Sequence, residues 1–482
     1  MSTPARCDIA MVGAGPAGLA AALAAAGFGC SVTLIDSGQA IGGQIYRQNT
    51  VNSGGGRSAS PDSERLPPRL QRAARHPRVR QLAAASVWHA APDPAAGPDG
   101  GFVLRLADAA GRGGAAPGEL RVRSVVVATG ATELVLPFPG WDLPGVTTAG
   151  AAQALLKGQG VTAGTRVIVA GSGPLLLPVA AGLAAAGVRV AAVLEATAAK
   201  VSARHAARLA AYPGKLREAA GYAATLARFR VPVRTGHAVI ACHGAGRVQR
   251  AAVARLDRDW RPVPGSQRVE TVDAVHASFG FSPALELARA LGCADAQHPA
   301  RPVAAVTHDG DQATSVPGVF AAGEVTGIGG AQLAELEGYL AGASAARYLG
   351  RLHPVAYAAR TRTLRARLGP ARRFAALLDE AYPFRPGWLD WPGPDTIACR
   401  CEDTRWAQIG DAVAAGAGDV RAVKGLTRCG MGYCQGRICG PALQYAVAAT
   451  AGRPLAEAGD LHARPLLTPV TLDAIADATS DP

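Results

Sequence analysis

The stretch DIAMVGAGPAGLAAALAAAGFGCSVTLID, residues 8–36, predicts an apolar strand, a glycine-rich turn, a helix of small residues and a second strand. In the turn, Gly13 permits the tight bend, Gly15 lets the backbone approach a pyrophosphate, and Gly18 allows the helix to pack closely on the strand. The helix N-terminus stabilises anionic phosphates, and Asp36 follows the second strand, where an acid accepts ribose hydroxyls. A glycine motif between strand and helix, with an acid at this distance, predicts a dinucleotide-binding βαβ unit.

A second copy of this pattern lies at residues 166–196, RVIVAGSGPLLLPVAAGLAAAGVRVAAVLEA. Gly171 and Gly173 recur in the turn and Glu195 follows the second strand, which identifies an internal repeat. Leu176 stands at the third glycine position, so we expect a wider helix–strand spacing and an altered nucleotide pocket. Glu195 favours NAD over NADP. The pattern is equally compatible with bound NAD or another adenine nucleotide and with an empty structural unit.

Four cysteines near the C-terminus form the pairs Cys399-x-Cys401 and Cys434-x4-Cys439. Four thiolates on short loops can hold a [2Fe–2S] cluster or a structural zinc ion. Zinc sites usually space their paired ligands by two to four residues, so the tight C-x-C pair favours iron–sulfur. A fifth cysteine, Cys429, is interpreted as a non-ligand packed beside the cluster, because its use would break the pairing. Buried thiols without a metal are the alternative.

Composition and charge exclude several classes of function. The 482 residues leave room for two to four domains. The net charge of +13 is carried by scattered basic residues, mostly arginine, without a nucleic-acid motif, so no nucleic-acid partner is expected. Two long uncharged runs, 9–35 and 167–188, are each interrupted by a glycine turn, so we expect neither a transmembrane segment nor a signal peptide. A cytoplasmic location follows, and the unpaired cysteines suit a reducing compartment.

Motifs for thiol chemistry and hydrolysis are absent from the sequence. No C-x-x-C or C-x-x-x-x-C pair occurs in the first 300 residues, which excludes a redox-active disulfide there. The ten histidines are dispersed and none belongs to a visible nucleophile or metal constellation. We therefore single out no catalytic acid or base, and electron transfer remains as the expected chemistry.

Further segments resemble flavoproteins with two dinucleotide-binding domains: GGQIYR at 42–47, VRSVVVATGATE at 122–133 and VPGVFAAGEVTG at 316–327. The resemblance implies that each contacts FAD. Glu324 stands where the family has an aspartate that contacts the ribityl chain, so the acid is one methylene longer. A helix that opens near Ala331 could stabilise negative charge on reduced flavin. The residues expected to bind FAD are Gly13, Ala14, Gly15, Pro16, Ala17, Gly18, Asp36, Gly42, Gly43, Gln44, Gly130, Gly323, Glu324 and Ala331.

The whole arrangement resembles the FAD-containing A subunits of opine oxidases, hydroxyproline dehydrogenases and the B subunit of hydrogen cyanide synthase. The match is carried by GGQIYR, GSGPLLL, CRCED and TRCGMGYCQGRIC, and the last two resemble the bacterioferritin-associated-ferredoxin type of [2Fe–2S] domain. It implies an α/β fold with tandem Rossmann-like domains and a small helical cluster domain. The expected boundaries are an FAD-binding domain at 1–140 and 268–350, a second, NAD-type Rossmann domain at 141–267, a helical and Pro/Trp linker at 351–395, a cluster domain at 396–452 and a tail at 453–482.

The resemblance also implies a function. It indicates an FAD-dependent electron-transfer subunit of an amine or amino-acid dehydrogenase of the opine, hydroxyproline or glycine type. Its implied partners are a flavoprotein subunit of the D-amino-acid-oxidase type and a small ferredoxin-like subunit, with a quinone or cytochrome as acceptor and peripheral membrane contact through the complex. A stand-alone NADH-dependent reductase that reduces a protein partner through its cluster is one alternative. A structural subunit with vestigial cofactors is another.

Overall fold

The strand–turn–helix–strand unit lies in the first of two large sheets. The computed structural model describes residues 5–48, 66–96, 100–109, 118–198, 203–461 and 464–479. Within these residues the first sheet has the strand order β3-β2-β1-β6-β5-β4, and β19 pairs with the end of β6. All neighbours are parallel except that β5 runs antiparallel to β4 and β6. The bounds are β1 (Ala5–Val12), β2 (Val32–Ile35), β3 (Val79–Leu82), β4 (Ala85–Pro92), β5 (Phe102–Asp108), β6 (Glu119–Val127) and β19 (Val319–Ala321).

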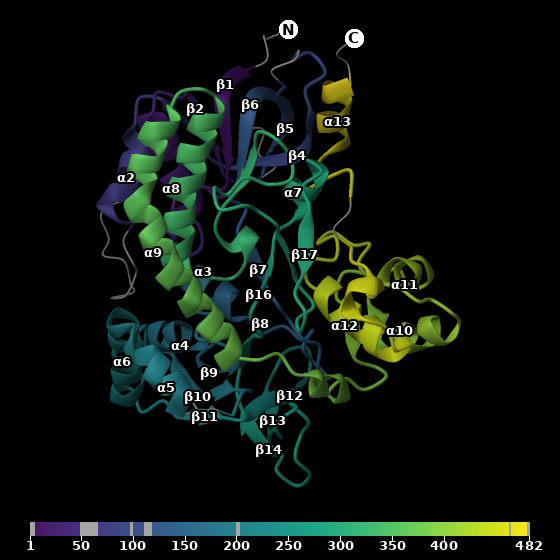
Figure 1. Ribbon diagram of the computed structural model, residues 1–482. Coiled ribbons are helices and arrows are strands. Elements are labelled where there is room, and N and C mark those ends of the chain that lie inside the picture. The colour runs from purple at the N-terminus through teal and green to yellow at the C-terminus, as the bar shows by residue number, and fades with distance from the viewer. Residues whose placement is uncertain are drawn as a thin grey trace.

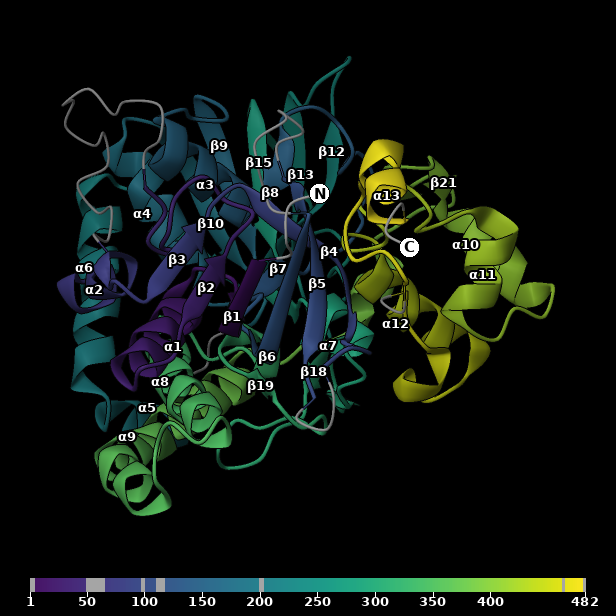
Figure 2. The same ribbon diagram turned by 90° about the horizontal axis from the view of Figure 1, so that it is seen from above.

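Helices α1 (Pro16–Gly27) and α8 (Ala331–Tyr348) pack against each other beside this sheet (Figure 2). Glycine makes their close approach possible, because a Cβ at Gly338 would lie 2.1 Å from the Ala17 carbonyl oxygen. Most of α8 is buried, which agrees with its many alanine, leucine and glycine residues. The other helices of this half are α2 (Pro68–Arg75), α7 (Glu286–Ala290) and α9 (Pro354–Ala381).

A second, fully parallel sheet forms the other half, with the order β11-β10-β9-β15-β8. A three-stranded antiparallel sheet, β12-β13-β14, lies beside it (Figure 1). The strand bounds are β8 (Val146–Thr148), β9 (Arg166–Gly171), β10 (Arg189–Glu195), β11 (Val233–Thr235), β12 (His237–His243), β13 (Arg250–Arg255), β14 (Arg268–Thr271) and β15 (Ala274–Ser278). The helix bounds are α3 (Ala149–Gln159), α4 (Leu176–Ala185), α5 (Ala203–Ala210) and α6 (Pro213–Arg228).

The chain crosses between the halves twice, through β7 (Ala131–Glu133) and β16 (Phe281–Pro283), which pair with each other antiparallel. The return expected at residue 268 is wrong, because β15 lies between β9 and β8 in the second sheet. Both sheets contain buried parallel strands, so a short apolar strand fits either of them equally well. Only the tertiary structure assigns β15 to its sheet. After the return, the first half adds β17 (Asp295–Gln297), β18 (Ala304–Val306) and the 3₁₀ turn η2 (Glu324–Thr326).

The C-terminal domain is helical and lies at one side of the two halves (Figure 1). Trp388, in the linker, is fully buried and its ring packs against those of Phe384, Trp406 and Tyr445. This aromatic cluster joins the C-terminal domain to the core of the second half. The bounds are η3 (Pro386–Asp390), β20 (Ile397–Cys399), β21 (Thr404–Arg405), α10 (Trp406–Ala414), α11 (Val420–Thr427), α12 (Gly440–Ala451), η4 (Leu455–Ala458) and α13 (Leu472–Thr479).

The tail after the cluster domain returns to the first half of the molecule. The Leu467 N–H donates a hydrogen bond of 2.8 Å to the Trp88 carbonyl oxygen in β4, and the Leu467 side chain joins the core on that side. Among the described residues, we find no helix with both the length and the apolar composition needed to cross a membrane.

Candidate functional site

The turn between β1 and α1 has the geometry expected of the glycine motif. A Cβ at Gly13 would lie 2.1 Å from the Ala128 carbonyl oxygen, and one at Gly18 would lie 1.7 Å from the Gly13 carbonyl oxygen. Both glycines are therefore required for close backbone packing. Gly15 differs, because the nearest atom to its Cβ position is the Gly43 Cα at 3.9 Å. Its backbone faces a cavity at the N-terminus of α1, as a pyrophosphate site requires.

Asp36 closes the motif at the end of β2. Its carboxylate accepts N–H hydrogen bonds from Ala14 at 2.5 Å and from Gly38 at 2.7 Å, and it lines the same cavity. The acid thus orders the turn and also borders the space in which a ribose would lie.

The cavity between the two halves has a volume of about 2560 Å³. Pockets for small ligands usually have roughly 300–1,000 Å³, so this cleft can hold a dinucleotide and further groups. The chemistry of its walls fits FAD, since glycine backbone, a helix N-terminus and an acid meet there. The predicted FAD residues that line it are Gly13, Gly15, Pro16, Ala17, Asp36, Gly43, Gln44, Gly130, Gly323, Glu324 and Ala331.

Three of the predicted FAD residues, Ala14, Gly18 and Gly42, do not line the cavity. Gly42 has a φ of +117° and its N–H donates a hydrogen bond of 2.8 Å to the Ala14 carbonyl oxygen. A Cβ at Gly42 would lie 2.5 Å from the Tyr46 carbonyl oxygen. These residues shape the walls of the cleft from behind.

Two acids of α8 belong to the cleft and were missed at the level of sequence. Glu335 pairs with Arg69 at 2.5 Å, and Glu337 pairs with Arg372 of α9 at 3.1 Å. Glu337 also accepts the Gly323 N–H at 3.1 Å, so it positions the segment that is expected to meet the ribityl chain. The signal was the pair of acids in the otherwise apolar run AELEG.

Glu324 accepts a hydrogen bond from the Gly330 N–H at 2.7 Å, just before α8 begins. Burial raises the pKa of Glu324 to about 7, and the charge of Glu337 acts in the same direction. The extra methylene relative to aspartate lets the carboxyl reach the loop that precedes α8. Its expected contact with the ribityl chain stays a prediction.

The second glycine motif differs from the first in its helix. Gly173 has open space around its Cβ position. Like Gly15 in the first motif, it lines the cleft. The Glu195 carboxylate accepts N–H bonds from Gly173 at 2.9 Å and Thr197 at 2.8 Å. However, α4 begins only at Leu176, three residues after Gly173, whereas α1 begins directly after Gly15. The helix N-terminus is therefore set back from the turn in the second unit.

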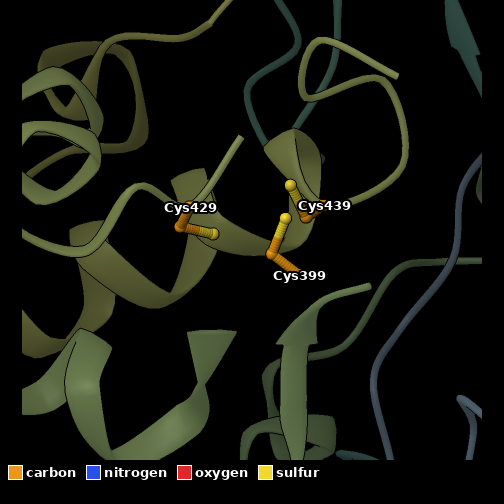
Figure 3. Close-up of side chains that lie close together, drawn as sticks. All are labelled: Cys399, Cys429 and Cys439. Carbon is orange, nitrogen blue, oxygen red and sulfur yellow. The ribbon is translucent and has the colours of Figure 1, made fainter. Parts of the chain in front are cut away.

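The sulfurs of Cys399, Cys429 and Cys439 all lie within 4.8 Å of one another in the C-terminal domain (Figure 3). Hydrogen bonds from the thiols of Cys429 and then Cys439 hold the pKa of Cys399 well below its usual value. The Gly430 N–H also points at the Cys399 sulfur, at 3.5 Å. Such N–H donors raise the reduction potential of an iron–sulfur cluster.

Cys401 and Cys434 complete the group of thiols. A Cβ at Gly432 would lie 2.1 Å from the Cys401 Cβ, so this glycine brings the second loop against the first. Cys401 is exposed and Cys434 half-buried. The four predicted ligands, Cys399, Cys401, Cys434 and Cys439, line one cavity of about 180 Å³ together with Thr147 and Ala277 of the second half. Convergent thiols around one small space fit a [2Fe–2S] cluster.

The comparisons with known proteins agree with this architecture. A family model described as pyridine nucleotide-disulphide oxidoreductase matches residues 7–338, and a BFD-like [2Fe-2S] binding domain matches residues 397–449. The opine oxidase A subunit of Agrobacterium tumefaciens (strain Ach5) is 34% identical over 97% of this chain and 91% of its own length. The chain belongs to the family of opine oxidase A subunits. The expected resemblance, fold class and cofactors FAD and [2Fe–2S] are thereby confirmed.

Two further relatives extend the family comparison. Hydrogen cyanide synthase subunit HcnB of Pseudomonas aeruginosa is 31% identical over 89% of this chain and 90% of its own length. The crystal structure of L-proline dehydrogenase from P. horikoshii shares the fold, with a TM-score of 0.67 at 20% identity over 98% of this chain and 81% of that one. The chain is an FAD-dependent oxidoreductase with a [2Fe–2S] domain.

Proposed function

We propose that this chain is the electron-transfer subunit of a multi-subunit dehydrogenase that oxidises the C–N bond of an amine or amino acid of the opine, hydroxyproline or glycine type. The relatives named as subunits of opine oxidase and hydrogen cyanide synthase support this class of reaction and the need for partner chains. The proposed partner is a flavoprotein subunit of the D-amino-acid-oxidase type, together with a small ferredoxin-like subunit.

A shared wall between the two cofactor cavities carries the proposal. Thr148 and Ile438 line both the large cleft and the small cysteine-lined cavity. Thr148 caps α3, and the neighbouring Gly150 N–H donates a hydrogen bond of 2.8 Å to Glu133, which lies three residues after Gly130. The cleft that contains the expected flavin segment and the cavity that contains the cysteines thus share two wall residues.

The overall reaction balances with this route. Oxidation of an amine to an imine releases two electrons and two protons, and the imine hydrolyses to a 2-oxo acid and a free amine, or forms a Δ1-pyrroline from a cyclic substrate. When bound, FAD accepts electrons in pairs and the cluster passes them singly. The cleft residues of this chain would hold FAD and the four cysteines would hold the cluster, and a quinone or cytochrome is the proposed final acceptor.

The cofactor ligands form part of the same proposal. Cys399, Cys401, Cys434 and Cys439 are proposed to bind the cluster, and the cleft residues named above to bind FAD. The main alternative is a stand-alone NADH-dependent reductase, favoured by the open turn at Gly173. The set-back N-terminus of α4 opposes it, because fewer helix N–H groups face a pyrophosphate.

The test is an anaerobic reduction of the chain purified alone. FAD, iron and sulfide are quantified, and the flavin absorbance is then followed on addition of NADH and, separately, of opines and cyclic amino acids. We expect the purified chain to contain bound FAD and two irons. In the absence of the partner subunits, we expect none of these compounds to reduce the flavin. Bleaching of the flavin by NADH alone would establish the stand-alone reductase instead.

A further inference from the structure

We propose that an acidic electron-carrier protein docks on the exposed side of the cysteine loops, where α11 and the loop after it form a basic surface with an apolar centre. The inference rests on the proposed electron-transfer function, because it names the kind of partner that would take electrons from this domain. We call this region the exit surface, and it consists of Arg421, Lys424, Leu426, Arg428, Met431 and Tyr433.

The exit surface adjoins the most accessible of the predicted cluster ligands. Cys401 is exposed, whereas the other three are buried or half-buried. Gly432 lies directly against this residue, because a Cβ at Gly432 would lie 2.1 Å from the Cys401 Cβ. Its two neighbours in the chain are exposed, Met431 by 38% and Tyr433 by 82%. Since electron transfer slows steeply with distance, a carrier has to approach the cysteines from this side.

The apolar part of the exit surface continues onto α11. Val420 and Val423 of this helix are buried, and Leu426 follows at the same spacing of three residues but is 65% exposed. The Met431 N–H donates a hydrogen bond of 2.9 Å to the Arg428 carbonyl oxygen, so the loop turns back on the helix end. Both views place α11 at the outer side of the molecule, away from the two large sheets (Figures 1 and 2). Exposed tyrosine, methionine and arginine are residue types enriched in protein interfaces.

The charge of this segment selects the kind of partner. Residues 420–439 contain four basic residues and no acidic one. The pKa of Lys424 is lowered by burial and then by the positive charges of Arg464 and Arg421, which shows that cations gather at this helix. A surface of one sign attracts a partner of the opposite sign and accelerates its association. The expected partner is therefore acidic.

The acids of the neighbouring cysteine loop do not cancel this charge. Glu402 pairs with Arg428 at 2.8 Å, and the side chain of Glu402 is only 16% exposed. Asp403 is exposed and contributes one negative charge near the cations. The exit surface thus keeps an excess of positive charge around its apolar centre.

A protein fits this side of the domain better than a small acceptor does. The cavity at the four cysteines has a volume of about 180 Å³, and the cluster is proposed to occupy it. Pockets for small ligands usually have at least roughly 300 Å³. A carrier that docks on the exit surface needs no such pocket. Each encounter moves one electron, so this chain is oxidised by one electron and the carrier is reduced by one.

The experiment uses two haem proteins that each accept one electron, the acidic cytochrome b5 and the basic cytochrome c. The variants are the charge reversal Arg421→Glu/Lys424→Glu, Tyr433→Ala and the matched Tyr433→Phe. The control reversal is Arg217→Glu/Arg228→Glu, which changes two exposed arginines of α6 on the opposite side of the molecule (Figure 1). Iron, sulfide and thermal unfolding establish that each full-length protein is folded and loaded.

Two measurements are made on every protein. Calorimetric titration gives the affinity of the oxidised chain for each oxidised cytochrome. Stopped-flow mixing gives the second-order rate at which the chain, reduced with dithionite and freed of excess reagent, reduces each cytochrome. Both are repeated at ionic strengths of about 0.01 M and about 0.1 M, where the Debye length falls from roughly 30 Å to 10 Å.

We expect wild type to bind and reduce cytochrome b5 in preference to cytochrome c, with a rate that falls as the salt concentration rises. The reversal at Arg421 and Lys424 should lower that rate by about tenfold or more, and the control reversal should leave it within about twofold of wild type. Tyr433→Ala should weaken the affinity by about tenfold, whereas Tyr433→Phe should keep it.

A preference for cytochrome c, no measurable affinity of wild type for cytochrome b5 at low salt, or equal effects of the two reversals would overturn the inference. A wild-type chain without iron would contradict the proposed function instead. In that case the calorimetric affinities would still decide whether an acidic protein binds the exit surface.

Discussion

Arg400, between the two cysteines of the C-x-C pair, stacks on Trp141 of the second half, with its guanidinium carbon 4.0 Å from the ring centroid. Trp141 in turn donates its indole N–H to the Ile397 carbonyl oxygen at 2.5 Å. One tryptophan thus holds both the side chain and the backbone of the first cysteine loop. The contact places the proposed cluster ligands against the half of the molecule that contains Thr148.

Replacing Arg400 by alanine should loosen this loop. A partly desolvated cation–π contact contributes roughly 1–2 kcal/mol, and we expect amide exchange in residues 397–405 to accelerate accordingly. Arg405→Ala is the control, since Arg405 lies in the same segment and its side chain pairs with the exposed Asp395. Equal acceleration in both variants, measured by hydrogen exchange and mass spectrometry, would show that the stacking has no special role.

Replacing Gly15 by alanine should remove FAD and leave the protein folded. The added methyl meets no atom closer than 3.9 Å, so it fits the fold but projects toward the expected pyrophosphate. Gly27→Ala, at the far end of α1 and also in open space, should retain FAD. The measurement is the FAD-to-protein ratio after purification, together with the thermal unfolding curve. Full FAD occupancy in the Gly15 variant would refute the predicted pyrophosphate position.

Truncating Trp388 should separate the cluster domain from the second half. The fully buried ring touches three aromatic neighbours, and a Trp→Ala change in such a core costs about 3–5 kcal/mol. Trp388→Phe is the matched variant, because the indole N–H has no hydrogen-bond partner among the described residues. We expect denaturant unfolding of the alanine variant to show an early transition of the C-terminal domain. A single, unshifted transition would argue against this role.

Stability should depend on pH through His276, which is fully buried on β15 and hydrogen-bonded to Thr147 at 2.8 Å. Burial lowers the pKa of His276 to about 4, opposed by the charge of Asp273. Its folded pKa lies below the unfolded value of about 6.5, so the unfolded chain binds the proton first. The stability that the neutral, buried His276 ring provides is complete above pH 6.5. As the pH falls toward 4, the free energy of unfolding decreases by roughly 3 kcal/mol.

Urea unfolding of wild type and His276→Asn between pH 7 and pH 4.5 measures this loss. Asparagine keeps a polar group near Thr147 but does not titrate in this range. We expect the free energies of unfolding of the two proteins to converge as the pH falls. Parallel curves would mean that His276 is not the group that titrates.

Sequence reasoning went furthest where a local pattern has only one physical solution. Gly18 is required by its contact with the Gly13 carbonyl oxygen inside one βαβ unit, so the glycine spacing alone predicted the turn, although Gly13 itself packs against Ala128 of a distant strand. The C-x-C pair likewise predicted convergent thiols, because two cysteines so close must share a loop. Glu335 and Glu337 escaped notice, since their partners Arg69 and Arg372 are distant in the chain.

By itself, then, the sequence determined the two glycine turns, the acids that close them and the cysteine-rich loops, because each is marked by a short run of residues with a fixed spacing. Only the tertiary structure decided that β15 belongs to the second sheet, that Arg400 stacks on Trp141, and that Thr148 and Ile438 divide two cavities. These relationships join segments more than a hundred residues apart. They follow from how buried surfaces pack together, which no local pattern encodes.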